Sequence, residues 1–187
     1  MKIDTSSIAN LPSNFGSFKI KAYKEGEKEH LAIFTKNLPD IPVVRIHSEC
    51  LTGDTLGSLK CDCGDQLKFA MQYVQKEGGI ILYLRQEGRN IGLLNKVNAY
   101  SLQDTGLDTV EANHQLGFSA DSRSYEIVEF ILKDLGIAKI KLLTNNPRKV
   151  KSLKDIEIVE RLPIIMESND FNENYLKTKK EKLGHMF

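Results

Sequence analysis

The chain has 187 residues, of which 41% are hydrophobic and 27% charged, and its formal net charge is only +1. This balance provides enough apolar material for a core and gives no strong field toward nucleic acid or a membrane surface. The stretch Met1–Thr5 has no apolar character of a signal peptide, and no apolar run is long enough to span a bilayer, so we expect a cytoplasmic protein. The length predicts one domain over residues 1–187, with a polar tail at about 170–187.

The first third of the chain is predicted to be β-structure. Phe15–Tyr23 and Leu31–Phe34 have the composition of strands, and the charged turn around Gly26 between them predicts a hairpin. Val43–His47 is a further short strand, which ends just before Cys50.

Strands and helices alternate through the rest of the chain. We expect a helix through Leu67–Val74, a strand at Ile80–Leu84, a helix at Ile91–Leu102, a helix that starts at Asp121–Ser124 and ends at Gly136, a strand at Lys139–Leu143 and a last strand at Ile156–Val159. The continuous apolar run Ile80–Leu84 indicates a strand that is covered on both faces. The pattern predicts an α/β protein, with a layered α/β/α domain, a mixed β-sheet and a β-rich N-terminal part.

All three cysteines lie in one short polar stretch, at Cys50, Cys61 and Cys63. Three thiolates can hold one zinc ion and leave the fourth position open for water or substrate, as catalytic zinc sites do. The spacing C-x10-C-x-C differs from the paired C-x2-C of zinc fingers, and the nearby glycines Gly53, Gly57 and Gly64 suggest loops. The alternative is a set of three buried free thiols, which the polar surroundings disfavour.

Arginine is scarce in this chain, with six residues against twenty lysines. Because a guanidinium group binds phosphate or carboxylate through two parallel hydrogen bonds, arginines at turns and strand ends indicate a polyanionic small ligand; ordinary ion pairs are the alternative. The segment Thr144–Lys149 adds an Asn cap, a proline in the first helical turn and a cation, a combination that attracts anions. The arginines placed in this way are Arg45, Arg85, Arg89, Arg123 and Arg148.

Four other side chains could carry chemistry, and each has a structural alternative. Asp121 is either a helix cap or a carboxylate that accepts a proton. Tyr100 is either a hydroxyl donor to a substrate or a half-buried helix aromatic. His47 and His114 are ligands, acids or, more simply, hydrogen-bonded histidines of polar loops.

Five long motifs of the chain stand out: Arg45–Asp54, Cys61–Gly64, Arg85–Leu93, Thr109–Phe118 and Thr144–Lys149. Together they resemble the GTP cyclohydrolase II family of riboflavin biosynthesis, in its stand-alone single-function form. The resemblance extends from about Leu11 to Gly184.

The resemblance implies a reaction with two hydrolyses. Water activated by zinc attacks C8 of the guanine, the imidazole ring opens and formate leaves, and pyrophosphate is cut from the triphosphate. The product is 2,5-diamino-6-(5-phosphoribosylamino)pyrimidin-4(3H)-one. The family also requires Mg²⁺ for the triphosphate, and it suggests a homodimer. From the charge balance we expect binding to neither nucleic acid nor membrane.

The family's functional positions fall on named residues of this chain. Cys50, Cys61 and Cys63 would hold zinc, and three thiolates leave that site with a net negative charge, which makes its water less acidic. Tyr100 would be catalytic in ring opening and Asp121 the proton acceptor, while Arg123 corresponds to a nucleophile toward the α-phosphate or, in our interpretation, an electrostatic clamp. The positions that would bind GTP are Arg45, Ile46, His47, Ser48, Glu49, Gln66, Glu87, Gly88, Arg89, Thr109, Thr144 and Lys149.

Glu87 is the residue we expect to read the guanine, because a carboxylate can accept from N1–H and the 2-amino group together. Three other functions remain open at this point. One is a GTP ring-opening enzyme that stops at the formamidopyrimidine. Another is a non-catalytic zinc module that binds a nucleotide or RNA, and the third is a thiol redox protein, although the chain lacks C-x-x-C.

Overall fold

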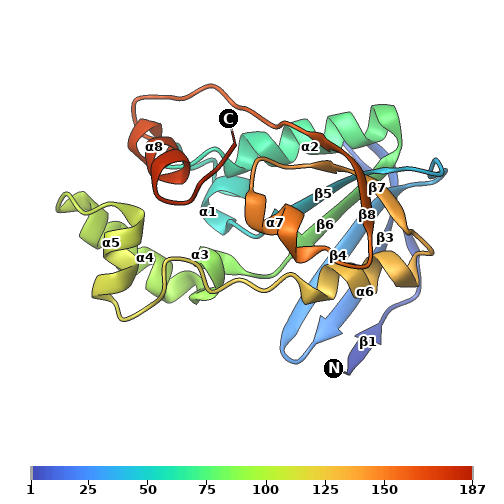
Figure 1. The fold of residues 1–187 in the computed structure, drawn as a ribbon, viewed down its shortest axis with the longest axis horizontal. Helices are drawn as coiled ribbons and strands as arrows, with labels where there is room; N and C mark the ends of the chain where they lie inside the picture. The colour runs from blue at the N-terminus through green and yellow to red at the C-terminus, as the bar shows by residue number, and fades with distance from the viewer. Residues whose placement is uncertain (1, 187) are drawn as a thin grey trace.

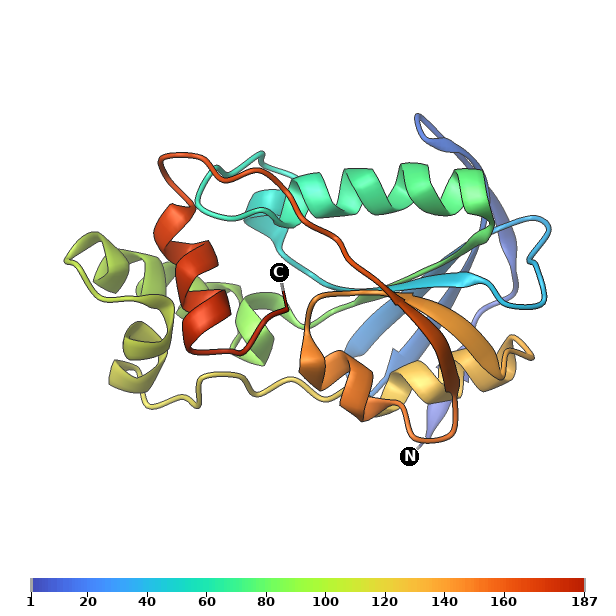
Figure 2. The same cartoon turned by 45° about the horizontal axis from the view of Figure 1, so that its top comes forward.

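The computed structural model describes residues 2–186, which form a mixed eight-stranded sheet with helices on both of its faces (Figures 1 and 2). The predicted α/β class with a mixed sheet is therefore confirmed. The strands are β1 (Ile3–Thr5), β2 (Ala9–Ser13), β3 (Gly16–Glu25), β4 (Lys28–Thr35), β5 (Val43–Ser48), β6 (Gly79–Leu84), β7 (Lys139–Leu143) and β8 (Glu157–Leu162). The helices are α1 (Leu51–Asp54), α2 (Cys63–Glu77), α3 (Glu87–Asn90), α4 (Gly92–Asp104), α5 (Thr109–Gln115), α6 (Glu126–Asp134), α7 (Pro147–Ser152) and α8 (Glu173–Glu181).

The sheet combines an antiparallel and a parallel half. Its order is β1-β3-β4-β6-β5-β7-β8, and β2 pairs with β3 outside this path. The predicted hairpin is confirmed: Glu25 pairs with Lys28, and Gly26 takes the left-handed conformation at φ +58° that its turn requires. Strand β5 runs parallel to both β6 and β7, because a helix separates it from β6 in the chain and brings the chain back to the same end of the sheet.

The core lies on both faces of the central strands. Alternate residues of a strand point to opposite faces, so Val43 and Ile81 pack with α2 on one side. Val44 and Leu82 pack with α6 on the other side. The views agree that α2 and α6 lie on opposite faces of the sheet (Figures 1 and 2). The prediction that Ile80–Leu84 is covered on both faces is therefore confirmed.

The carboxyl ends of the parallel strands lie together at one edge of the sheet. Strands β5, β6 and β7 end at Ser48, Leu84 and Leu143, and each is followed at once by one of the motifs singled out in the sequence. Helices α3, α4, α5 and α8 lie beyond this edge, on the left in Figure 1. This is the edge at which open α/β sheets bind their ligands.

Two local predictions were wrong. Helix α6 begins at Glu126 and not at Asp121–Ser124, because the Asp121 carboxylate accepts hydrogen bonds from the backbone and side chain of Arg123 and holds that segment outside the helix. Gly53 and Gly64 lie in helices rather than loops. Both are needed for close packing, as the site below shows.

The polar tail is more ordered than its composition suggested. Thr178 and Lys179 of α8 are buried, and Lys179 Nζ lies 2.6 Å from Asp62 Oδ1. Asp62 is the residue between Cys61 and Cys63 in the sequence. Met186 N donates to Asn145 O at 2.9 Å. The tail docks through polar contacts, so no apolar periodicity could reveal it. Within residues 2–186, no helix has both the length and the apolar character needed to cross a membrane.

Candidate active site

The three cysteines form one compact cluster at the edge of the sheet. Their sulfur atoms all lie within 4.8 Å of one another, and Cys50 Sγ is 3.7 Å from Cys61 Sγ. Tetrahedral zinc with Zn–S bonds of about 2.3 Å would place its sulfurs about 3.8 Å apart, so the donor set fits zinc. In the described part of the chain, no histidine or carboxylate joins Cys50, Cys61 and Cys63 in this cluster. Such a site keeps a fourth coordination position open.

Two glycines allow the cysteines to come together. A Cβ atom on Gly53 would lie 2.8 Å from Cys61 Sγ, and one on Gly64 would lie 2.3 Å from the Gly53 carbonyl oxygen. Helices α1 and α2 can therefore meet closely only without these side chains. The Asp54 carboxylate completes the arrangement by accepting from the Cys50 backbone N–H at 3.0 Å.

The cluster is built to hold negative charge. Hydrogen bonds from Cys61 and Cys63 lower the pKa of the Cys50 thiol, and the nearby Lys96 ammonium lowers it further. The hydrogen bond with Cys50, together with burial, raises the pKa of Cys61 to about 11, and hydrogen bonds with Cys50 and Cys61, together with burial, raise that of Cys63. Cys50 is therefore the first thiolate of the cluster, and a metal would displace the protons of the other two.

The turn after β6 bends sharply over the cysteines. Gly88, Arg89 and Asn90 all have positive φ, at 61°, 60° and 77°. This conformation buries Glu87, whose carboxylate accepts from Lys96 Nζ at 2.7 Å, from Gly88 N at 2.9 Å and from Leu51 N at 2.6 Å. Most of the acceptor positions of the Glu87 carboxylate are thus occupied by donors of the protein itself, and its role in recognising guanine stays a prediction.

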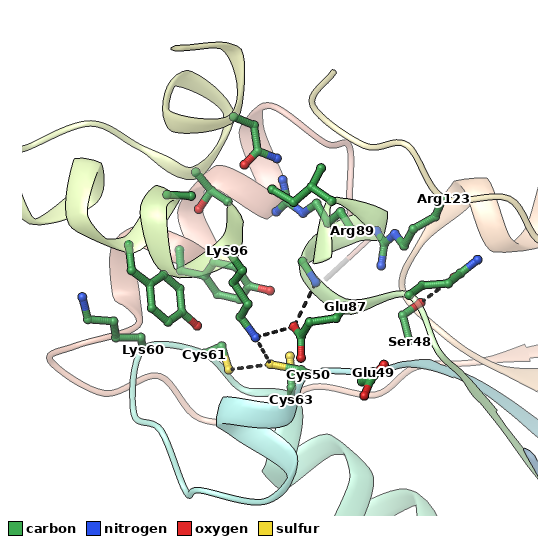
Figure 3. A pocket seen from close by; sticks show the side chains of 18 of the residues that line it. Ser48, Glu49, Cys50, Lys60, Cys61, Cys63, Glu87, Arg89, Lys96 and Arg123 are labelled. Carbon is green, nitrogen blue, oxygen red and sulfur yellow. Dashed lines mark hydrogen bonds and ion pairs between the residues drawn. The ribbon is translucent and has the colours of Figure 1, made fainter. Parts of the chain in front are cut away.

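A first cavity opens over the cysteine cluster and this turn (Figure 3). Tyr100 faces it from α4, and its hydroxyl lies 3.1 Å from Thr52 Oγ1. Burial raises the pKa of Tyr100, so the phenol is neutral near pH 7 and able to donate. The lining residues are Ser48, Glu49, Cys50, Lys60, Cys61, Cys63, Gln86, Glu87, Gly88, Arg89, Ile91, Lys96, Ala99, Tyr100, Gln103, Thr109, Asn113, Arg123, Tyr175, Leu183 and His185.

A second cavity lies beside the first and is strongly cationic. Burial lowers the pKa of Arg45 to about 10, and burial together with the neighbouring cations lowers that of Lys149 well below its usual value. Arg45 Nε is buried without a partner, so it can donate to a ligand. The lining residues are Arg45, His47, Ser48, Cys63, Gln66, Arg123, Thr144, Asn145, Asn146, Lys149, Ile164, Tyr175, Lys179 and His185.

The two cavities share one wall, to which Ser48, Cys63, Arg123 and the tail residue Tyr175 contribute. One ligand can therefore extend from the cysteine cluster into the cationic cavity. The charge of the second cavity suits an anionic part of such a ligand.

Arg123 is held rigidly at that shared wall. Its Nε and Nη2 donate to the two oxygens of Asp121 at 2.8 and 2.7 Å, and Arg148 Nη1 lies 2.6 Å from the same carboxylate. Burial alone would raise the pKa of Asp121, but the two arginines lower it to about 2. A carboxylate with this pKa is a weak base, and its position suits the orientation of Arg123.

His47 is a buried residue of β5 and not a loop histidine. Its Nε2 lies 3.0 Å from Asp54 Oδ1, its ring stacks on Tyr83, and its Nδ1 is buried without a partner. Burial lowers the pKa of His47, so the imidazole is neutral near pH 7. His114, by contrast, is exposed on α5 and lines neither cavity.

The structure brings nearly all the sequence-predicted site residues to the two cavities. Besides His114, the candidates that line neither cavity are Arg85, Arg148, Ile46 and Asp121. Ile46 is packed in the core, and its carbonyl accepts from Lys149 Nζ at 2.7 Å. The Asp121 carboxylate accepts from Arg123, which lines both cavities. Sequence reasoning missed Lys96 and Tyr175 among the lining residues. Lys96 lies four residues before Tyr100 on α4, a helical spacing that could have revealed it.

Comparison with known proteins gives a consistent result. A family model described as GTP cyclohydrolase II matches residues 4–163. A protein named GTP cyclohydrolase-2 from Campylobacter fetus subsp. fetus (strain 82-40) is 67% identical over 189 residues, which cover 100% of this chain and 97% of that protein. Another protein of that name, from Helicobacter pylori (strain Shi470), is 51% identical over 99% of this chain and 98% of its own length.

A solved structure of a two-domain 3,4-dihydroxy-2-butanone 4-phosphate synthase from A. baumannii is also similar to this chain. The sequence identity is 20% and the TM-score 0.47. The match covers 88% of this chain and 40% of that chain.

Proposed function

The chain belongs to the GTP cyclohydrolase II family of hydrolases, and from this premise we propose that it converts GTP to 2,5-diamino-6-(5-phosphoribosylamino)pyrimidin-4(3H)-one, formate and pyrophosphate. This reaction is the first committed step of riboflavin biosynthesis. The observation that carries the proposal is the three-sulfur cluster, which adjoins a cationic cavity through a shared wall.

Zinc is the metal we propose for Cys50, Cys61 and Cys63. When bound there, it supplies a Lewis acid that activates water for attack on the guanine ring. The neutral hydroxyl of Tyr100, oriented by Thr52, can donate a proton or hydrogen bond at the face of the cavity where the ring opens.

The triphosphate is proposed to occupy the second cavity. Arg45 and Lys149 are buried there, and the nitrogen atoms of each have lost hydration that a phosphate oxygen can replace. Mg²⁺ would accompany the triphosphate and offset part of its charge. Thr144, the residue just after β7, adds a buried side chain to the wall of this cavity.

Arg123 is proposed to act as an electrostatic clamp on the α-phosphate. Burial alone would lower its pKa, but the bidentate pairing with Asp121 raises the pKa above its usual value. A guanidinium held in this way keeps its proton, which makes it a strong donor and a poor nucleophile. The clamp predicts no covalent guanylyl adduct on this residue by mass spectrometry.

Product analysis tests the function directly. Purified, zinc-loaded protein is incubated with GTP and Mg²⁺, and formate, pyrophosphate and the pyrimidine are measured. All three products together are expected. Pyrophosphate with a pyrimidine that retains the formyl carbon would indicate the formamidopyrimidine-forming alternative, and zinc binding without turnover would indicate a binding module.

The assembly and the location of the enzyme are proposed from the same premise. We expect a homodimer in the cytoplasm, which binds GTP and neither nucleic acid nor membrane. Light scattering on the eluting protein gives the mass directly, and a mass of one chain would refute the dimer. Leu94 and Val97 on α4 are 78% and 53% exposed, and they offer an apolar face whose substitution by glutamate can be compared in the same assay.

A further inference from the structure

A buried lysine on α4 faces the cysteine cluster. Lys96 is only 8% exposed, so its ammonium group cannot reach water as surface lysines do. The absence of a side chain on Gly88 makes room for it, since a Cβ atom there would lie 3.1 Å from Lys96 Cβ. Burying an ammonium group is costly unless it is paired, so the partners of Lys96 indicate what the group is for.

Lys96 Nζ contacts two anionic groups at once. It lies 3.2 Å from Cys50 Sγ and 2.7 Å from Glu87 Oε1 (Figure 3). The other oxygen of Glu87 accepts from Leu51 N at 2.6 Å. Lys96 therefore contacts the Cys50 sulfur, and Glu87 holds the backbone of the next residue, Leu51. Both side chains come from helices that are more than 30 residues away from Cys50 in the sequence.

The charges at this place explain the need for a cation. Three thiolates around Zn²⁺ leave one net negative charge, and Glu87 adds a second within a buried region. Among residues 2–186, Lys96 is the one lysine or arginine that donates a hydrogen bond to a cysteine sulfur. A donor on a thiolate also withdraws electron density from sulfur and fixes the side-chain rotamer, as outer-shell partners of metal ligands do.

We propose that Lys96 is a positioning residue of the metal site, whose ammonium group fixes the Cys50 thiolate and offsets the negative charge of the three-sulfur cluster. The inference rests on the proposed zinc site and assigns this lysine a role in binding the metal that is separate from contact with GTP. Three thiolates alone would leave the metal too electron-rich to activate water well, and the positive charge of Lys96 offsets part of this effect.

The test measures zinc affinity at one fixed pH by competition with a chromogenic chelator. Lys96→Met removes both charge and donor, whereas Lys96→Arg keeps both. Lys76→Met is the matched control, because Lys76 is 81% exposed on α2. We expect a loss of about tenfold or more in affinity for Lys96→Met, recovery of most of it for Lys96→Arg, and no change for Lys76→Met.

A second pair of variants separates a direct role from one through Glu87. Lys96→Met leaves the Glu87 carboxylate buried and unpaired, and this variant can misfold. Glu87→Gln and the double variant Lys96→Met/Glu87→Gln remove that charge and keep the shape. If Lys96 acts on Cys50, its removal still weakens zinc binding about tenfold in the Glu87→Gln background. An unchanged affinity in that background would overturn the proposal.

Cobalt spectroscopy gives a readout that does not depend on activity. With Co²⁺ in place of zinc, the sulfur-to-cobalt charge-transfer band should move to longer wavelength in Lys96→Met, because a sulfur without its donor releases an electron more easily. If the native protein binds one zinc and Lys96→Met has the same zinc affinity and the same cobalt spectrum, the role of Lys96 is refuted and the proposed function is not. A native protein that binds no zinc would refute both this inference and the proposed function.

Discussion

The ion pair between α8 and the cysteine segment makes a sharp prediction. Lys179 and Asp62 have side chains that are only 10% and 2% exposed, and their atoms lie 2.6 Å apart. Burial alone would raise the pKa of Asp62, but Lys179 lowers it below its usual value. Among the described residues, replacing Lys179 with methionine leaves the buried Asp62 carboxylate with Gln66 as its one side-chain donor.

The magnitude follows from how the protein can relax. Removing one partner of a buried pair costs about 3–5 kcal/mol if the other charge stays buried. In Lys179→Met, α8 can undock and expose Asp62 to water. The loss of stability therefore cannot exceed the free energy with which the tail docks. A docking loss of about 3 kcal/mol raises the undocked population roughly 100-fold. The midpoint of global urea unfolding should change little.

Limited trypsin digestion is the assay, and Lys180→Met is the control. Lys180 is exposed on the same helix, and each variant removes one tryptic site from α8. We expect rapid cleavage of the tail only in Lys179→Met, together with a raised KM for GTP, because Tyr175 and Lys179 line the cationic cavity. Tail cleavage and KM equal to those of Lys180→Met would refute the reasoning.

Three further predictions concern the cluster, the clamp and the ring-opening face. Gly53→Ala places a methyl group 2.8 Å from Cys61 Sγ and should abolish stoichiometric zinc binding, measured by metal analysis; full zinc content would contradict the packing argument. Tyr100→Phe should keep zinc and lower formate release by 10²-fold or more, and normal release would exclude Tyr100 from the reaction. Asp121 has its pKa depressed to about 2, so its pairing stabilises the fold above pH of about 4 and is lost as the pH falls through about 2. The gap in urea stability between native protein and Asp121→Asn should therefore close by about 2 kcal/mol over that range, and a constant gap would contradict the pairing.

The fold was largely predictable because its strands carry their own signals. Ile80–Leu84 is apolar throughout because both of its faces are covered, and Gly26 marks a turn that requires positive φ. The start of α6 was misplaced because Asp121 resembles a helix cap, while its carboxylate is bound instead by Arg123 and Arg148. A side chain committed to a distant arginine cannot be recognised from its neighbours in sequence.

Site residues whose role follows from their residue type were predicted from the sequence. Those that reach the site only because α8 docks on it were missed. Cys50, Cys61 and Cys63 are recognisable because three thiols in a polar segment have few other uses. Lys179 lies in a lysine-rich stretch that looks solvated, and only its contact with Asp62, 117 residues away, distinguishes it from Lys180. Composition describes that stretch correctly and says nothing of which lysine becomes buried.

The buried cations of the second cavity imply that a polyanion binds together with protons. Lys149 has its pKa lowered well below the usual value by burial and by the charges of Arg45, Arg123 and Lys179. A bound triphosphate favours the charged lysine, so the pKa rises and protons are taken up at pH values between the free and bound pKa. Titration calorimetry with inorganic tripolyphosphate, in two buffers of different ionisation enthalpy, should show this uptake in the native protein and its loss in Lys149→Met. Equal heats in both buffers would mean that the Ile46 carbonyl, 2.7 Å from Nζ, already keeps Lys149 charged in the free protein.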